Sequence, residues 1–122
     1  MSDSDIAKAI EEVGSKKAKK KKFDKTPTGT QGKKLPKDVK AALEEKFGTN
    51  LSKVMIHKGG DASAICKEIK ATSFAIGQHV YFHKDSYSKD SKLMAHELTH
   101  ILNASKGKPP KPKAGEVLFN KK

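Results

Sequence analysis

Large apolar side chains are unevenly spread along this chain, and their distribution limits where a folded core can form. Residues 1–34 hold few of them, whereas residues 35–105 carry nearly all that a core could use. A unit of about 70 residues buries only just enough apolar surface to fold, so a bound metal ion would add useful stability. We therefore expect one small domain at 35–105, a flexible arm at 1–34 and a proline- and lysine-rich tail at 106–122.

Lysine dominates the arm, which bears on the partners that the chain can bind. All 26 basic residues are lysine, and the net charge is +12. Sequence-specific readout of nucleic acid relies mainly on arginine, so a polyanion-binding function ranks last. The segment "KKAKKKK" at 16–22 predicts a disordered basic arm for loading, delivery or targeting, and contact with nucleic acid or an anionic surface is not expected. Within the arm, helical spacing of apolar residues predicts one short helix at 3–13.

The sequence has no sign of membrane insertion or of the common secretory route. Its first 13 residues are acidic and amphipathic, so no signal peptide is predicted. No apolar run approaches the length of a membrane span. The single cysteine, Cys66, excludes an internal disulfide, and its place beside an apolar helix face predicts a core thiol rather than a nucleophile.

Helical and strand patterns alternate through the domain and predict an α+β fold in the order helix, strand, helix, hairpin, helix. The predicted elements are a helix at 36–47 with Gly48 as its C-terminal cap, a strand at 52–57, a helix from Asp61 or Ser63 to about 71, strands at 73–76 and 79–83 joined around Gly77-Gln78, and a helix at about 89–104 capped by Ser86 or Ser88. The segment "EVLF" at 116–119 predicts a small strand or docking segment.

The last helix contains "LMAHELTH" at 93–100, an HExxH motif. On a helical wheel His96 and His100 lie about 40° apart, so both imidazoles can reach one ion. Glu97 is offset to one side, where its carboxylate can take a proton from an activated water. The opposite side of the helix is apolar and comprises Met94, Leu98, Ile101 and Leu102. The histidines are thus free to face a cleft, which favours metal binding over two surface histidines on an amphipathic helix.

A catalytic zinc site needs three protein ligands and one water, so a third ligand has to be found. His57 ends the strand at 52–57 and is the favoured candidate, although it can equally be a half-buried histidine that holds the following glycine turn. Downstream, Glu116 is the only strong candidate. The remaining alternatives are His79, His83 and Asp85.

Two further features bear on substrate. Tyr87 can donate a hydrogen bond to the oxyanion of a tetrahedral intermediate, and capping or packing is the competing interpretation. The strand at 79–83 can pair with an extended peptide by strand addition and so place the scissile carbonyl near zinc.

Several segments, in the same order, resemble the eCIS core domain, a bacterial domain encoded near extracellular contractile injection systems. "LPKDVKAALEEKFGTNLSKVMIH" is similar to the family's "LP…LE..FG..L..V.IH", "ATSFAIGQHVYFH" to "A.AF..G..IYF", and, after Tyr87, "LMAHELTH" to "LLAHELTH". The resemblance extends from Leu35 to about Leu102. Met55 replaces the family's usual arginine, and "ILNASKG" replaces the glutamines after the motif, so substrate and partner are not expected to carry over.

The resemblance implies a zincin-like metallopeptidase that binds Zn²⁺ through His96, His100 and His57, the last at the family's "IH" position, with Glu97 as general base. It further implies a toxin, effector or cargo that acts on a protein or peptide substrate and contacts tube or spike components of the injector. Such a protein resides in the bacterial cytoplasm before loading and is then delivered to a target cell. The alternative is a non-catalytic, zinc-stabilised cargo or tail-tip module. An open fourth coordination position beside Glu97 would favour the enzyme.

Overall fold

The computed structural model describes residues 3–111 and 115–121, without the side chains of residues 3, 4, 85 and 88. In chain order its elements are α1 (Asp3–Val13), β1 (Lys19–Lys22), β2 (Gln31–Lys34), α2 (Lys37–Phe47), β3 (Met55–Lys58), α3 (Ala62–Ile69), β4 (Ala71–Ile76), β5 (His79–Phe82), α4 (Asp85–Lys89), α5 (Ser91–Ala104) and β6 (Glu116–Lys121). The α+β class predicted from the sequence is confirmed.

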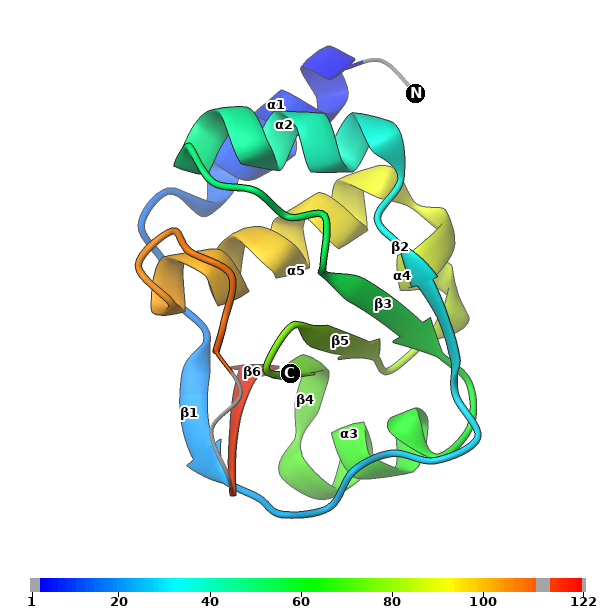
Figure 1. Cartoon of the computed structure of the whole chain (residues 1–122). Coiled ribbons are helices and arrows are strands. Elements are labelled where there is room, and N and C mark those ends of the chain that lie inside the picture. Colours follow the sequence, from blue (N-terminus) through cyan, green and yellow to red (C-terminus); the bar gives the residue numbers. More distant parts are fainter. Residues whose placement is uncertain (1–2, 112–114, 122) are drawn as a thin grey trace.

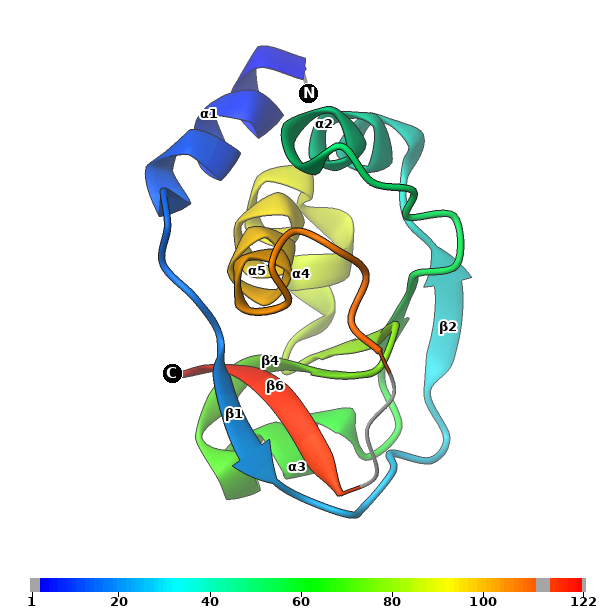
Figure 2. The same cartoon turned by 60° about the vertical axis from the view of Figure 1, so that its left-hand side comes forward.

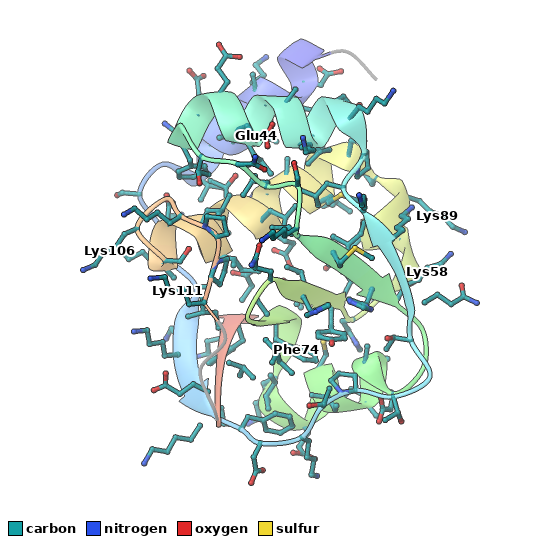
Figure 3. The ribbon with its side chains drawn as sticks, viewed as in Figure 1. Glu44, Lys58, Phe74, Lys89, Lys106 and Lys111 are labelled. Atoms are coloured by element: carbon teal, nitrogen blue, oxygen red, sulfur yellow. The ribbon has the colours of Figure 1, made fainter. Side chains whose placement is uncertain are left out.

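Within the described part of the chain, six strands form one mixed sheet with helices on both of its faces (Figures 1 and 2). Helices α1, α2 and α5 cover one face, and the larger hydrophobic core lies beneath them. Helix α3 covers the other face over a second core, which contains the fully buried Phe74 (Figure 3). Cys66 is buried in this second core, which agrees with the prediction of a core thiol. The labelled lysines Lys58, Lys89 and Lys106 point outward from the molecule.

The strand order is β1-β6-β4-β5-β3-β2, and only β3 and β5 run parallel. The predicted hairpin is confirmed, since β4 and β5 pair antiparallel with Ile76 opposite His79. Gly77 has φ +59°, the left-handed conformation that a two-residue hairpin turn requires. Because β5 has β4 on one side and β3 on the other, it offers no free edge, and the prediction that a peptide adds to this strand is wrong.

The N-terminal arm is ordered, contrary to the disorder predicted from its lysine content. Helix α1 lies where the short helix was predicted, and its Ile6, Ile10 and Val13 are buried. Strands β1 and β2 then pair with β6 and β3. The prediction failed because pairing at a sheet edge uses backbone N–H and C=O groups, so an all-lysine strand can form with every side chain exposed.

Helix α5 begins later than predicted because the backbone leaves the helical conformation at Asp90. This residue is extended, with φ −109° and ψ 107°, and its carboxylate accepts hydrogen bonds from the backbone N–H groups of Lys92 and Leu93. Aspartate is among the best N-terminal caps, so it ends α4 and starts α5. Both predicted caps, Ser86 and Ser88, lie inside α4 instead.

The C-terminal tail also contributes to the fold, since "EVLF" begins β6, which lies between β1 and β4 in the sheet. Among the described residues, no helix is both long enough and apolar enough to cross a membrane.

Candidate metal centre

The two motif histidines lie one turn apart on α5 and are both half-buried. Their Nε2 atoms are 3.2 Å apart, with the rings inclined at 65°. Two imidazole nitrogens that share a tetrahedral zinc, each at about 2.0–2.1 Å, stand about 3.3 Å from one another. The spacing of His96 and His100 therefore fits two ligands of one zinc ion.

Glu97 follows the first histidine and is buried, with 5% of its surface exposed. Thr72 Oγ1 on β4 donates a hydrogen bond of 2.5 Å to Glu97 Oε1. Burial raises the pKa of Glu97, and this exceeds the opposite effects of hydrogen bonds from Thr72 and Ser73 and of the charge of His96. A carboxylate with a raised pKa is suited to accept and return protons near neutral pH.

These side chains open into a shallow hollow of about 580 Å³, which we call the HExxH hollow. Its lining comprises Lys16, Lys17, Lys19, Thr72, Tyr87, Leu93, His96, Glu97, His100, Asn120 and Lys121. Tyr87 stacks on Phe82, and burial followed by the charge of Glu97 raises the pKa of its phenol. The structure thus brings together four residues predicted from the sequence: Tyr87, His96, Glu97 and His100.

The segment before β1 is hydrogen-bonded directly to α5. Ala18 donates its backbone N–H to the carbonyl oxygen of His100 at 2.9 Å. The side-chain amide of Asn103 donates to the carbonyl oxygens of Gly14 and Lys16, at 3.0 and 2.7 Å. Burial, then His96 and Lys16, lower the pKa of His100, which favours the neutral imidazole that binds metal.

His57 lies elsewhere. Its Nε2 is 2.9 Å from Nδ1 of His79, its Nδ1 is 3.2 Å from the hydroxyl of Thr30, and its ring stacks on Tyr81. It lines a different hollow, between β2 and β3. Burial and the neighbouring His79 lower the pKa of His57. The structure therefore does not bring His57 together with His96 and His100.

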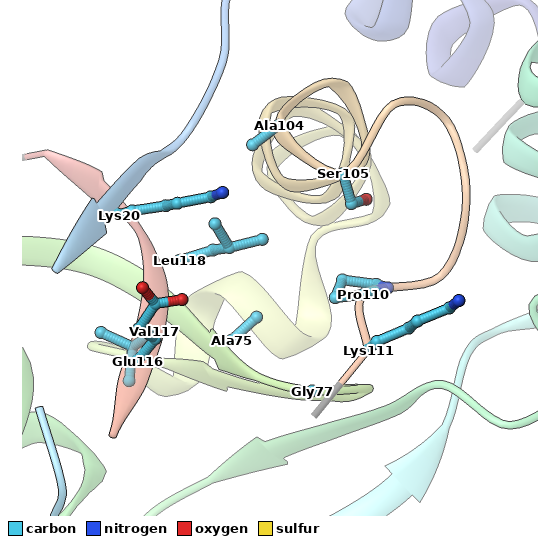
Figure 4. A pocket seen from close by; sticks show the side chains of 10 residues that line it. All are labelled: Lys20, Ala75, Gly77, Ala104, Ser105, Pro110, Lys111, Glu116, Val117 and Leu118. Atoms are coloured by element: carbon cyan, nitrogen blue, oxygen red, sulfur yellow. The ribbon is translucent and has the colours of Figure 1, made fainter. Parts of the chain in front are cut away.

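The other proposed third ligands are also placed away from the pair. Glu116 starts β6 and lines a separate hollow of about 150 Å³ beside Lys20 and Val117 (Figure 4). His83 faces the hydroxyl of Ser63, and the side chain of Asp85 lies outside the described residues. Within the part of the chain that the structure describes, no group of three or more His, Cys, Asp or Glu is arranged to hold a metal. The third ligand stays a prediction.

Three polar residues near the motif were missed by the sequence analysis. Thr72 holds the Glu97 carboxylate, and Asn120 donates its amide to the Glu97 carbonyl oxygen and to Ser73. Asn103 attaches the segment before β1 to α5 through hydrogen bonds to the carbonyl oxygens of Gly14 and Lys16. The one available signal was the pair of adjacent hydroxyls in the otherwise apolar strand "ATSFAI", which is unusual for a buried strand. Nothing in the sequence indicated that β6 would bring Asn120 beside this strand.

An α+β domain whose helix presents two histidines, one turn apart, and a buried glutamate to an open hollow belongs to the HExxH class of domains. More specifically, the chain belongs to the eCIS core domain family, because the model of that family matches residues 34–108. The family is associated with extracellular contractile injection systems. No curated protein and no solved structure matches the chain. The matched range contains His96, Glu97 and His100 but not α1, β1 or β6.

Proposed function

We propose that the chain is a zinc-dependent peptidase and an effector or cargo of a contractile injection system. The observation that carries this proposal is the 3.2 Å spacing of the His96 and His100 Nε2 atoms beside a buried glutamate, in a hollow open to solvent. Family membership supports the association with an injector.

Each residue of the hollow has a chemical role in this proposal. His96 and His100 hold the zinc ion, which when bound supplies the Lewis acidity that makes water nucleophilic at neutral pH. Glu97 takes a proton from the attacking water and passes it to the leaving amine. Thr72 keeps the carboxylate in one orientation through its hydrogen bond. Tyr87 stays protonated because its pKa is raised, and it donates to the developing oxyanion.

A non-catalytic, zinc-stabilised module is the second candidate. It is favoured by one observation: among the described residues, no group of three or more His, Cys, Asp or Glu side chains is arranged to hold a metal ion. In that case a partner, such as a tube or spike component, completes the coordination, and the domain serves as a cargo or tail-tip element. The two candidates differ in whether a coordination position beside Glu97 stays open to water.

The deciding experiment compares the wild-type chain with Glu97→Gln and with His96→Ala. Zinc content is measured by inductively coupled plasma mass spectrometry, and cleavage is measured by mass spectrometry of a proteome-derived peptide library. We expect His96→Ala to lose zinc, and Glu97→Gln to keep zinc but lose cleavage. Glu45→Gln, an exposed substitution on α2, is the matched control for charge and should behave as wild type.

Each outcome selects one interpretation. Zinc in the wild type without any cleavage would support the non-catalytic module. Equal cleavage by wild type and Glu97→Gln would refute the peptidase mechanism. A wild-type chain that binds no zinc would refute both.

A further inference from the structure

We propose that four lysines at the edge of the HExxH hollow select peptide substrates with acidic side chains. The four are Lys16, Lys17, Lys19 and Lys121, which we call the lysine rim. This inference deepens the proposed function of the same hollow and rests on it.

Charge around the hollow is strongly one-sided. Among the residues that the structure describes, four that line the hollow are lysines, and Glu97 is the one acidic residue of the lining. Glu97 cannot neutralise the rim effectively, since it is buried and accepts a hydrogen bond from Thr72. The two salt bridges found among the described residues, Lys25–Glu68 and Lys40–Glu44, involve no lysine of the rim. The rim is therefore a positive surface that an incoming carboxylate can contact.

The rim is fixed in place by the fold rather than carried on a free arm. Hydrogen bonds from Asn103 to the carbonyl oxygen of Lys16, and from Ala18 to that of His100, attach the segment to α5. On the other side of Ala18, β1 pairs with β6, with Lys19 opposite Phe119. This antiparallel register brings the start of β1 to the end of β6, where Lys121 lies. The backbone is thus ordered before a substrate arrives, which reduces the entropic cost of binding.

The lining favours a peptide over a nucleic acid as the anionic ligand. Single-stranded nucleic acids bind where basic side chains alternate with exposed aromatic rings on which bases stack. Apart from the two motif histidines, Tyr87 is the one aromatic residue among the described lining of the HExxH hollow, and its ring already stacks on Phe82. The chain also has no arginine, the residue best suited to bidentate contacts with phosphate.

The rim comes from parts of the chain outside the range matched by the family. Residues 34–108 supply Thr72, the motif residues and Tyr87, whereas all four rim lysines lie before or after that range. The chemistry at the histidine pair and the charge around it are therefore contributed by separate segments. A rim of this kind can set substrate preference without altering the motif.

The experiment measures binding in the Glu97→Gln background, so that turnover does not interfere. The probes are two fluorescein-labelled octapeptides, one of alternating glutamate and alanine and one with glutamine in place of each glutamate. Binding is followed by fluorescence anisotropy. The rim variant is Lys16→Gln with Lys17→Gln and Lys19→Gln. The control carries Lys37→Gln, Lys46→Gln and Lys53→Gln, three exposed positions outside the hollow.

Both triple variants lose three positive charges. Their comparison therefore separates an effect of the rim lysines from general attraction of an acidic peptide to a positively charged protein. Because each exposed ion pair contributes modestly, the loss of three should make the rim variant bind the acidic peptide roughly tenfold more weakly. The control should change binding by less than about twofold, because its lysines do not line the hollow and their charges are screened by salt. Circular dichroism checks that both variants are folded.

Three results would overturn the inference. The first is equal weakening of acidic-peptide binding in both triple variants. The second is equal affinity of the Glu97→Gln protein for the two peptides. The third is rim-dependent binding that is tighter for an oligothymidine of eight nucleotides than for the acidic peptide. Failure of the peptidase proposal is distinguishable from these, since peptide binding here requires neither zinc nor cleavage. A chain without zinc that still binds the acidic peptide through the rim would retain the anionic-peptide site and lose only the enzymatic role.

Discussion

Replacing Thr72 by valine tests whether Glu97 is a buried carboxylate whose charge is stabilised by one specific hydrogen bond. Valine has nearly the shape of threonine but cannot donate the 2.5 Å hydrogen bond from Oγ1 to Glu97 Oε1. Hydrogen bonds to charged groups contribute about 1.5–3 kcal/mol. Because this bond stabilises the charged form of Glu97, its loss should raise the pKa of the carboxyl further.

The sign of the pH effect follows from the direction of this shift. The pKa of Glu97 is already raised in the folded chain, mainly by burial. Stability from such a group is fully present below the unfolded-state pKa, about 4.3, and is lost as the pH rises through the higher folded-state pKa. Thr72→Val should therefore cost less at pH 4, where more of the carboxyl is protonated, than at pH 7, by up to about 1–2 kcal/mol.

The assay is urea unfolding of the metal-free chain at pH 4 and pH 7, with the free energy of unfolding obtained by linear extrapolation. Thr99→Val is the matched control, because the Thr99 hydroxyl donates to the carbonyl oxygen of Ala95 and does not contact Glu97. Its effect should be the same at both pH values. An equal cost of Thr72→Val at pH 4 and pH 7 would refute the argument that this hydrogen bond stabilises a charged carboxylate.

Three further predictions follow from the placement of single residues. His57→Ala should keep its zinc, measured by mass spectrometry, because His57 faces His79 in a separate hollow; loss of zinc would contradict this geometry and support the ligand set predicted from the sequence. Asp90→Ala should lower the free energy of unfolding by about 1 kcal/mol through loss of the α5 cap, whereas the exposed Asp24→Ala should not. Phe74→Ala should cost about 3–5 kcal/mol in urea unfolding, and a cost below 1 kcal/mol would show that the second core contributes little.

Elements defined by their own side chains were predictable from the sequence. Helix α2, with its apolar stripe and Gly48 cap, and the β4–β5 hairpin depend on local patterns, and both were found near their predicted positions. The grouping of His96, Glu97 and His100 was predictable for the same reason, since one helix carries all three. Tyr87 reached the same hollow because α4 ends only two residues before α5 begins.

Contacts between distant segments could not be predicted in this way. Asn120 reaches Glu97 only because β6 pairs with β4, and the lysines of β1 gain their place only because β6 offers them an edge. Backbone pairing leaves little trace in side-chain patterns, so a four-residue lysine strand had the composition of a disordered arm. His57 shows that a sequence position can also suggest a contact that the fold does not form. Its position in the sequence resembled that of a metal ligand, but β3 places its ring against His79.

The pairing of β1 with β6, which the disorder prediction missed, also determines how the lysine-rich segment acts on the HExxH hollow. Had residues 14–22 been a free arm, their charges would act on any polyanion and would be irrelevant to the hollow. Hydrogen bonds from Asn103 and Ala18 instead place Lys16 close enough to His100 to lower its pKa, so the arm is part of the site's electrostatics. Positive charge near a metal site weakens cation binding but strengthens binding of a carboxylate-bearing substrate. Asn103→Ala separates these effects: if the segment detaches, affinity for the acidic octapeptide should fall while affinity for zinc rises, and a parallel fall of both would refute this electrostatic account.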